Sequence, residues 1–240
     1  MPLKPIITLT SDFGIADPYV AAVKGTILNI NPNATIVDLS HDITPHRVEQ
    51  AAFTVSCALP YFPRGSIHVV VVDPEVGTHR RALALFTADG VFIGPDNGIL
   101  SPALSDAERE GAFDRPSLVP LPAGKQAFLL ANPRFQLSPP SATFHARDIF
   151  GPAAAYISVG AEPSDLGPRV QRIAALPPFR AVSAGDGNLV GQILHIDRFG
   201  NAITTIRGEQ LSSPNVRTEI SGRKIQGLCR TYADRRGVLD

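Results

Sequence analysis

The stretch VVVVDPEVGTHRRALAL, residues 69–85, carries the clearest structural signal in the sequence and also the first candidate functional group. Four successive valines predict a strand that is apolar on both faces, as in a parallel sheet covered by helices. The apolar run ends on Asp73, Pro74 stops the strand, and Arg80 and Arg81 follow within eight residues. An Asp-Pro pair is also typical of a surface turn. The pattern therefore allows two interpretations of Asp73, a turn residue and a working carboxylate, while Arg81 on its own favours a solvent-facing charge.

The residues before this stretch alternate between strand and helix patterns. Strands are predicted at 6–10, 34–40 and 66–73, because β-branched residues cluster there. Apolar residues at helical spacing follow Asp17-Pro18 and Thr44-Pro45, which are residue types that start helices. The alternation predicts an α/β layered N-terminal domain with a largely parallel sheet.

A segment rich in proline and glycine predicts a boundary between two domains. We expect an α/β N-terminal domain over residues 1–176, a linker over 177–184 and a smaller domain over 185–240. After the linker the chain consists of short strand-like runs, among them LVGQILHID and NAITTI. These runs predict an all-β, barrel-like C-terminal domain.

Composition and charge exclude several functional classes. The chain has 240 residues, of which 44% are hydrophobic and 18% charged, which predicts a globular protein with a substantial core. Its formal net charge is zero, so bulk charge attracts neither nucleic acid nor an anionic membrane. No apolar run reaches the ~20 residues of a membrane helix, and the N-terminal apolar run is too short for a signal peptide. Cys57 and Cys229 lie far apart, which argues against a zinc site or a disulfide framework and favours a reducing, cytoplasmic location.

Polar residues gather where the predicted strands end. Three groups of them are Ser11 with Asp12, Asp38 with His41 and Asp42, and Asp73. Ligands in open α/β sheets bind beyond the carboxyl ends of the strands, so Asp12 and Asp73 are predicted neighbours of one cleft. Structural alternatives stay open. Asp12 could be a turn residue and Asp17 a helix cap, and His41 and Asp42 could be loop residues rather than metal ligands.

Six longer stretches, spread over nearly all of residues 6–206, form an ordered series. They are SDFGIADPYVAAVKGTI, VDLSHDITPHRVEQAA, VVDPEVGTHRRALAL, GPDNGIL, TFHARDIFGPAAA and IDRFGNAITTI. In this order they resemble the S-adenosyl-L-methionine hydroxide adenosyltransferase family, whose relatives include the fluorinase and the chlorinase. The resemblance implies an α/β N-terminal domain and a C-terminal β-barrel. It also implies a homotrimer whose ligand lies between the N-terminal domain of one subunit and the C-terminal domain of the next.

The resemblance also implies a reaction. Water or hydroxide attacks C5′ of the ribose of S-adenosyl-L-methionine, and the products are adenosine and L-methionine. No cofactor and no metal is implied, since S-adenosyl-L-methionine is the substrate itself. A thioether leaving from a sulfonium needs no protonation, so no strong general acid is required. The catalytic residues of the family fall on Asp73, Arg80 and His145, with Asp73 accepting the proton while the other two hold the geometry. Without the resemblance, His145 would be interpreted as a satisfied histidine at a helix start.

Six further residues match substrate-binding positions of the family: Asp12, Asp17, Asn97, Asp197, Phe199 and Asn201. Asp12 matches a carboxylate that accepts hydrogen bonds from ribose hydroxyls. Asp197 matches the group that pairs with the methionine ammonium. Phe199 and Asn201 match an aromatic face and an amide near adenine, although Gly-Asn is also turn chemistry.

Three features depart from the family pattern. Glu75 stands where the family usually has glycine, so we expect strain if that position needs a positive φ. His46 replaces a large aromatic residue of the halogenating relatives. The family normally continues past TYADRRGVLD with strands that contact adenine, so an incomplete barrel with weakened adenine binding is predicted.

Two alternative functions stay open. One is a halide-using enzyme of the same fold, which the carboxylate of Asp73 disfavours because it repels an anion. The other is a non-catalytic protein that binds adenosine or S-adenosyl-L-methionine. Release of methionine from the substrate distinguishes an enzyme from such a binder.

Overall fold

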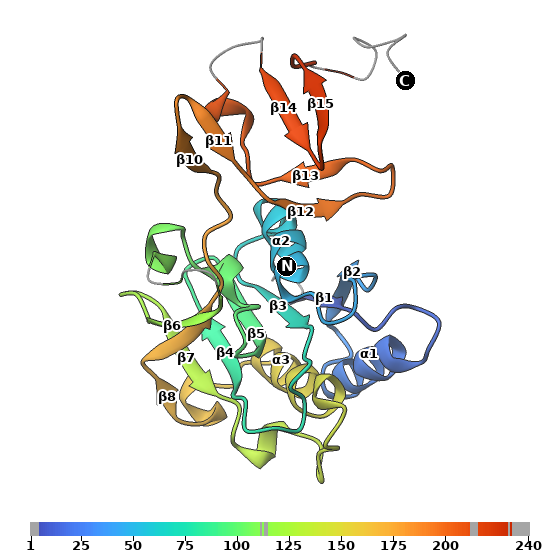
Figure 1. The fold of residues 1–240 in the computed structure, drawn as a ribbon. Coiled ribbons are helices and arrows are strands. Elements are labelled where there is room, and N and C mark those ends of the chain that lie inside the picture. The colour runs from blue at the N-terminus through green and yellow to red at the C-terminus, as the bar shows by residue number, and fades with distance from the viewer. Residues whose placement is uncertain (1–4, 111, 113–114, 212–215, 230, 232–240) are drawn as a thin grey trace. The chain divides into compact units, whose positions relative to one another are not determined.

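Seven strands form one mixed sheet in the first part of the chain (Figure 1). The structure is a computed structural model that describes residues 5–110, 112, 115–211, 216–229 and 231. In sheet order the strands are β2 (Thr35–Ser40), β1 (Ile6–Ser11), β3 (Ser66–Val71), β5 (Gly90–Pro95), β4 (Ala82–Phe86), β7 (Gln126–Leu129) and β8 (Arg169–Val170). The first four are parallel, and the other pairings are antiparallel. The parallel strands β1, β2 and β3 therefore end at the same edge of the sheet.

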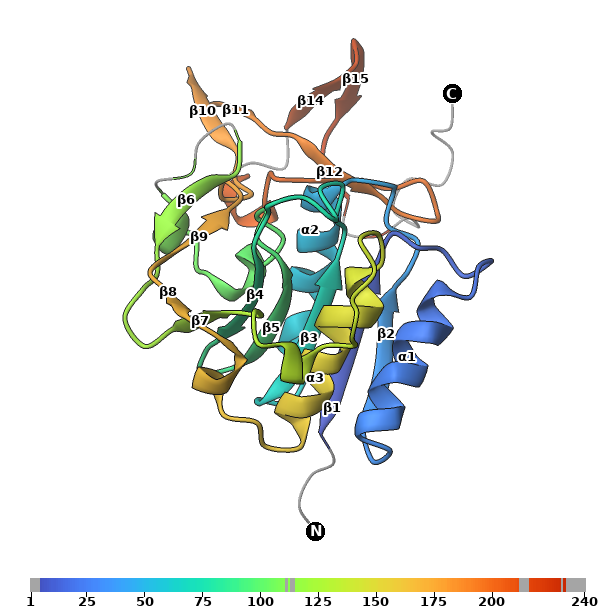
Figure 2. The same cartoon turned by 90° about the horizontal axis from the view of Figure 1, so that it is seen from below.

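Helices cover both faces of this sheet (Figure 2). Helices α1 (Tyr19–Ile30) and α3 (Gly151–Ser158) pack against each other on one face, and α2 (Val48–Ala58) lies on the other. A π-helical turn, Ala146–Phe150, leads directly into α3. Strand β3 is buried along its whole length, as the valine run predicts. Among the described helices, none has both the length and the apolar character needed to span a membrane.

Two helices begin later than the sequence pattern predicts. Helix α1 starts at Tyr19 with Pro18 in the N-cap position, and no side chain caps it, so the prediction of Asp17 as a cap is wrong. Helix α2 starts at Val48 because the residues after Pro45 form a turn instead. Proline suits the first turn of a helix, but it suits a turn equally well.

The second part of the chain is all-β. The chain divides into two compact units, the first ending at Pro178 and the second starting at Phe179. Three antiparallel two-stranded sheets pair β10 (Val182–Gly185) with β11 (Asn188–Val190), β12 (Ile193–Ile196) with β13 (Ala202–Thr204), and β14 (Arg217–Ile220) with β15 (Arg223–Gln226). An α/β unit followed by an all-β unit confirms the predicted fold class. Strand β10 lies partly in the range predicted as a linker, and the predicted end of the barrel at 232–240 lies outside the described residues.

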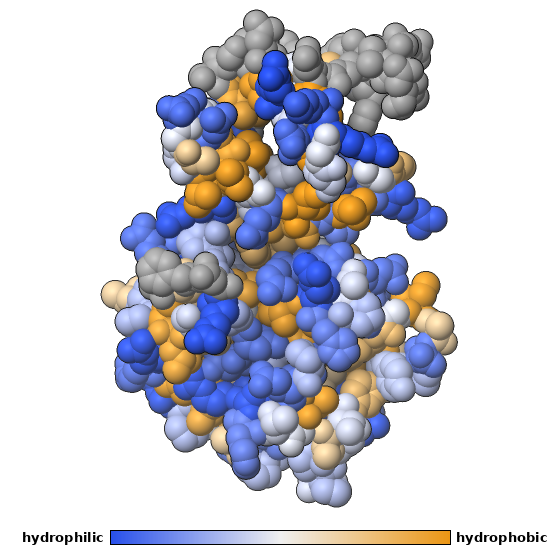
Figure 3. All heavy atoms as spheres, in the orientation of Figure 1, coloured by the Kyte–Doolittle hydropathy of each residue, from blue (hydrophilic) through white to orange (hydrophobic). Residues whose placement is uncertain are grey.

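The all-β unit exposes apolar side chains at its surface (Figure 3). The large ones are Val182, Val190, Ile193, Ile196, Phe199, Ile225 and Leu228. Phe199 is the most exposed of them, at 90% of its surface. Exposed apolar residues gathered in one small unit are typical of surfaces that bind a partner or a ligand.

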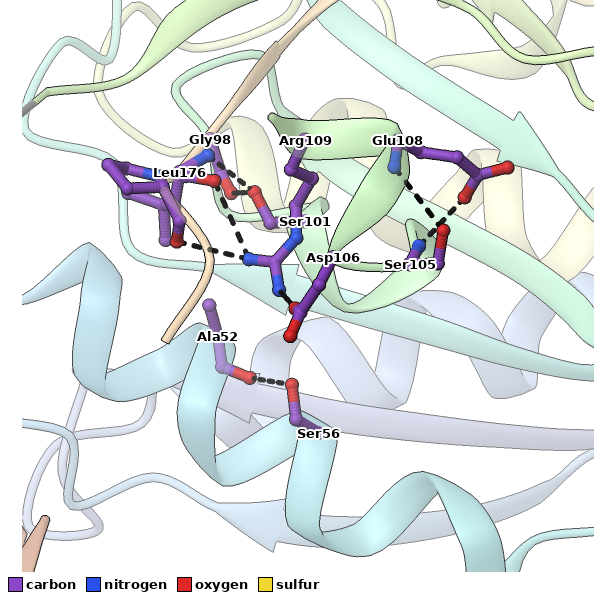
Figure 4. A network of polar contacts seen from close by, with 10 residues as sticks. Ala52, Ser56, Gly98, Ser101, Ser105, Asp106, Glu108, Arg109 and Leu176 are labelled. Carbon is purple, nitrogen blue, oxygen red and sulfur yellow. Dashed lines mark hydrogen bonds and ion pairs between the residues drawn. The ribbon is translucent and has the colours of Figure 1, made fainter. Parts of the chain in front are cut away.

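A buried polar network fixes the chain where it leaves the first unit (Figure 4). Arg109 donates to the carbonyl oxygens of Leu176 and Pro177, at 3.5 and 3.2 Å, and pairs with Asp106 at 2.5 Å. The hydroxyl of Ser101 accepts a hydrogen bond from the backbone N–H of Leu176 at 2.7 Å. Short strands complete this proline-rich region, since β6 (Ser117–Pro120) pairs with β9 (Arg172–Ala175).

The buried His68 of β3 is expected to make the stability of the fold dependent on pH. Burial lowers the pKa of His68 from 6.5 to about 4, so the ring is neutral in the folded protein. The unfolded chain takes up this proton below pH 6.5, and stability is therefore lost as the pH falls from 6.5 towards 4. At about 1.4 kcal/mol per pH unit, the loss is on the order of 3 kcal/mol. Urea unfolding of the protein and of His68→Gln across this range measures it, and an equal pH dependence of both would contradict the assignment.

Candidate active site

An arginine–carboxylate pair stands where β3 ends. The side chain of Asp73 is only 6% exposed, and that of Arg80 is 5% exposed. Arg80 donates from Nε to both oxygens of Asp73 at 2.9 Å, and its Nη2 also contacts Oδ2. The guanidinium lies over the ring of Phe150, with its carbon 5.3 Å from the ring centroid. This pairing of charges explains how an apolar strand can end on a buried carboxylate, and it holds the carboxylate in one orientation.

His145 completes this group. Arg80 Nη2 lies 2.7 Å from Nδ1 of His145. Arginine can only donate, so Nδ1 accepts and the proton of the neutral ring lies on Nε2. Burial lowers the pKa of His145 and the charge of Arg80 lowers it further, while Asp73 and Asp148 partly offset these effects. The ring is therefore neutral near pH 7. Its Nε2–H group is a donor on the side of the ring away from Arg80.

Asp73 and His145 border a cavity of ≈ 180 Å³ within the first unit, and Arg80 contacts both of them. Asp12, Asp73 and His145 all line it. The other lining residues are Phe13, His46, Val71, Pro74, Val76, Thr143, Phe144 and Ala146. The backbone N–H of His46 donates to Oδ2 of Asp12 at 3.0 Å, and His46 has a φ of 67°, which is uncommon outside glycine. The predicted cleft at the ends of β1 and β3 thus contains both predicted carboxylates.

The loop after Asp73 packs tightly against the loop before His145. Gly77 has a φ of 79°, and a Cβ there would lie 2.4 Å from the carbonyl oxygen of Ala142. Only glycine accommodates both the conformation and the close approach. Glu75 is not among the described residues with a positive φ, so the strain considered for this position does not arise.

Phe144 forms one wall of the cavity and is held by its neighbours. Its ring lies edge-to-face with Phe13 and Tyr19, at centroid distances of 6.0 and 5.4 Å. The guanidinium carbon of Arg147 lies 4.9 Å from the centroid of the same ring, and Nε of Arg147 donates to buried Asp148 at 2.6 Å. Aromatic and cation contacts of this kind restrict the ring to one position.

Of the predicted substrate-binding residues in the first unit, Asp17 and Asn97 do not line the cavity. Asp17 is exposed in the segment before α1. The amide of Asn97 donates from Nδ2 to the carbonyl of Val72 at 2.9 Å and accepts at Oδ1 from the N–H of Ile99 at 3.1 Å. Asn97 therefore supports the backbone next to Asp73.

The all-β unit contains the remaining predicted residues in one turn. Oδ1 of Asp197 accepts hydrogen bonds from the backbone N–H groups of Phe199 and Asn201 at 2.9 Å each, and Oδ2 accepts one from the Asn201 amide at 2.7 Å. The hydrogen bonds from Asn201, with that from Phe199, hold the pKa of Asp197 below its ordinary value. The turn therefore presents an ionised carboxylate beside an exposed aromatic ring.

Arg81 serves a different carboxylate from its neighbour Arg80. It pairs with Asp96, whose side chain is 4% exposed, and it donates to the carbonyl oxygen of Arg172 at 2.8 Å. Arg81 is 33% exposed, so it is partly solvent-facing as expected, but strand pairing also brings the buried carboxylate of Asp96 beside it.

Sequence reasoning missed the side chains that support the walls of the cavity. Phe13, Phe144 and Asp148 each stand within three residues of a predicted site residue, and that adjacency was the available signal. Which of two neighbouring side chains faces a cavity depends on the conformation of the loop. That conformation is set by contacts with residues that are distant in the sequence. The arrangement as a whole can hold one small polar nucleophile in a cavity with both polar and apolar walls and take a proton from it.

Comparison with known proteins assigns the chain to a family. A family model described as the SAM hydroxide adenosyltransferase N-terminal domain matches residues 7–167, and its C-terminal counterpart matches residues 191–237. A protein of Thermus thermophilus named (R)-S-adenosyl-L-methionine hydrolase is 40% identical over 97% of this chain and 84% of its own length. A fluorinase of Actinopolyspora mzabensis is 27% identical over 89% of this chain and 75% of its own length. The crystal structure of an uncharacterized conserved protein from Thermotoga maritima is similar with a TM-score of 0.80 and 30% identity, covering 95% of this chain and 84% of that one. The chain belongs to the S-adenosyl-L-methionine (SAM) hydroxide adenosyltransferase family.

Proposed function

We propose that this protein hydrolyses SAM at ribose C5′ and releases adenosine and L-methionine. The observation that carries the proposal is the group of Asp73, Arg80 and His145 at a cavity that Asp12 also lines. Relatives named (R)-S-adenosyl-L-methionine hydrolase, at 34–40% identity, support the same reaction. The fluorinase is more distant, at 27% identity.

The proposed step is an in-line displacement at carbon. The oxygen of water bonds to C5′ while the C5′–S bond breaks, and the bonding electron pair leaves with sulfur as the thioether of methionine. Asp73 accepts the proton that the water loses, Arg80 holds the carboxylate, and Nε2–H of His145 orients the water. The leaving group is neutral, so the step needs no acid.

Asp12 is proposed to bind the ribose hydroxyls. Its Oδ2 is occupied by the N–H of His46, which leaves Oδ1 to accept from the sugar. The sulfonium carries a positive charge, which the carboxylates of Asp12 and Asp73 attract. The apolar walls, among them Phe13 and Phe144, limit the water around the reacting carbon.

Incubation with SAM in oxygen-18 water tests the reaction. Chromatography and mass spectrometry should find adenosine and methionine in equal amounts, with the heavy oxygen in adenosine. A halogenated nucleoside formed in the presence of chloride or fluoride would instead indicate the halide-using function, and binding without methionine release would indicate a binder. Because the relatives' names specify the (R) sulfonium, separated (R) and (S) epimers are compared.

We also propose that the active form is a homotrimer in which a neighbouring subunit completes the site. The cavity of ≈ 180 Å³ is smaller than the roughly 300–1,000 Å³ of sites that enclose a small molecule. Asp197, Phe199 and Asn201 would supply the missing surface from the neighbour, and the exposed apolar residues of the all-β unit would be covered on assembly. A cytoplasmic location and independence of cofactors stay predictions.

Light scattering tests the assembly. We expect a trimer whose thermal stability rises with added adenosine or SAM by mass action, because the ligand binds only the assembled site. A monomer that still turns over SAM at low concentration would contradict the shared site.

The neutral state of His145 predicts an acid limit to activity. Protonation would place a second cation against Arg80 and remove the acceptor at Nδ1. Since the pKa of His145 is lowered from 6.5, kcat/KM should be constant above pH 6.5 and should fall only at more acidic pH. In His145→Asn, whose Oδ1 replaces Nδ1, this fall should move to lower pH, although the plateau is lower. An unchanged acid limb in the variant would assign the titration to another group.

A further inference from the structure

A chain of polar contacts outside the proposed reaction stands behind Asp12. Oγ of Ser11 lies 2.7 Å from Nδ1 of His41, and the two residues are 3% and 7% exposed. Nε2 of His41 lies 3.0 Å from Oδ1 of Asp38, and Nζ of Lys24 lies 2.5 Å from Oδ2. The contacts connect α1, the strand β2 and the end of β1.

The charges give this chain a direction. Burial acts to raise the pKa of Asp38, but the contacts with Lys24 and His41 outweigh it and hold the pKa below its ordinary value. Nε2 of His41 lies close to this carboxylate, although the ring N–H is not aligned well enough for a regular hydrogen bond. An ionised carboxylate only accepts, so its proximity favours the proton on Nε2 and leaves Nδ1 as an acceptor. The hydroxyl of Ser11 then donates to Nδ1, and its oxygen remains available to the N–H of Phe13 at 3.4 Å.

His41 holds the loop after β1 at two points. Its side chain contacts Ser11, and its carbonyl oxygen accepts from the N–H of Gly14 at 2.8 Å. Asp12 and Phe13, between these two points, both line the cavity. His46, five residues after His41, donates to Asp12 from the other side. The loop that contains His41 therefore determines where the Asp12 carboxylate lies.

Serine, histidine and aspartate also form the nucleophilic triad of many hydrolases. Here Ser11 is buried, and the space that it and His41 border with Val20 and Val69 amounts to ≈ 10 Å³, room for about one water molecule. A substrate cannot approach Oγ, so the set cannot act as a nucleophile.

We propose that His41 is a positioning residue that keeps Asp12 oriented for the ribose. The inference rests on the proposed function and adds a residue to the same site. Ribose hydroxyls are held alike in the ground state and the transition state, so losing the orientation of Asp12 weakens both equally. Such a loss raises KM and leaves kcat nearly unchanged. A substitution of Asp73 or Arg80, in contrast, should mainly lower kcat.

His41→Phe tests this, because it keeps a ring and removes both nitrogens. We expect KM for SAM to rise about tenfold while kcat stays within about threefold. His68→Phe is the matched control, since His68 is similarly buried and its Nδ1 contacts the hydroxyl of Thr8 at 2.9 Å. Thr8 lies inside β1, four residues before Asp12, whereas Ser11, the partner of His41, immediately precedes Asp12. The control should lose stability and keep its KM.

Two conservative variants separate the contacts of His41 and keep the test informative if the phenylalanine variant does not fold. His41→Asn puts an acceptor at the place of Nδ1 and should keep KM within about twofold of the parent. His41→Gln reaches towards Asp38 and leaves Ser11 without its acceptor, so its KM should rise as in His41→Phe. The opposite order of the two variants would overturn the proposal.

Adenosine binding, measured by calorimetry on the assembled protein, provides a readout that needs no turnover. The dissociation constant of adenosine should rise about tenfold in His41→Phe and Ser11→Ala, and not in His68→Phe. If the parent binds adenosine but does not cleave SAM, the proposed function fails while the role of His41 is still measured. An unchanged dissociation constant in His41→Phe, or an equal rise in His68→Phe, would refute the positioning role.

Discussion

Replacement of Asp73 with asparagine is expected to lower kcat for SAM hydrolysis by about 10²–10⁴-fold, the usual contribution of a positioned general base. Asparagine has nearly the same shape, but its amide cannot take the proton of the attacking water. The side chain of Asp73 is only 6% exposed and is held by Arg80. In the asparagine variant, bulk water therefore cannot easily reach this position and act as the base instead. The loss should be in kcat more than in KM, because the proton moves only in the transition state.

Asp96→Asn is the matched control for this variant. Asp96 is also a nearly buried carboxylate, 4% exposed, and it pairs with the adjacent arginine, Arg81. Both substitutions should destabilise the protein, because each leaves an arginine without its anion. Only Asp73→Asn should lower kcat by this large factor. If Asp73→Asn hydrolyses SAM at the parent rate between about pH 6 and pH 9, Asp73 is a turn residue and not the base.

Arg80→Ala is expected to lower kcat by about 10²–10³-fold, which is typical of losing one preorganised donor at a reacting centre. The variant removes the contacts with both Asp73 and His145, so the base and the proposed water donor lose their shared support. It also leaves a buried carboxylate unpaired, which should cost about 3–5 kcal/mol of unfolding free energy. Thermal unfolding and steady-state kinetics on the same samples separate the two effects.

Arg81→Ala controls for the loss of an adjacent arginine. It should reduce stability through Asp96 and leave kcat within a small factor of the parent, because neither Arg81 nor its partners Asp96 and Arg172 line the cavity. Arg80→Lys retains a positive charge without the bidentate geometry and serves if the alanine variant does not fold. In the double variant with Asp73→Asn, the losses should be far from additive, since the two residues act as one unit. Near-equal kcat values for Arg80→Ala and Arg81→Ala would remove Arg80 from the mechanism.

Local patterns in the chain predicted the main elements and the edge of the sheet where the site lies. The valine run before Asp73 is buried on both faces in β3, and the polar residues after the first and third strands line one cavity. Such signals are readable because strand periodicity and strand ends depend on neighbouring residues. The spacing of Arg80 seven residues after Asp73 likewise suits a loop that returns to the same point.

The exact partners of the side chains, in contrast, were decided by the tertiary structure. Ser11 meets His41 across thirty positions, and the buried carboxylate of Asp96 pairs with Arg81, because the strand order places distant segments side by side. The side-chain amide of Asn97 donates a hydrogen bond to the carbonyl oxygen of Val72, and no sequence motif indicates this contact. By itself the sequence determined the α/β and all-β parts and the residue types gathered at the strand ends. Only the fold decided which of those residues face the cavity and which support it, because hydrogen bonding and burial depend on neighbours that are distant along the chain.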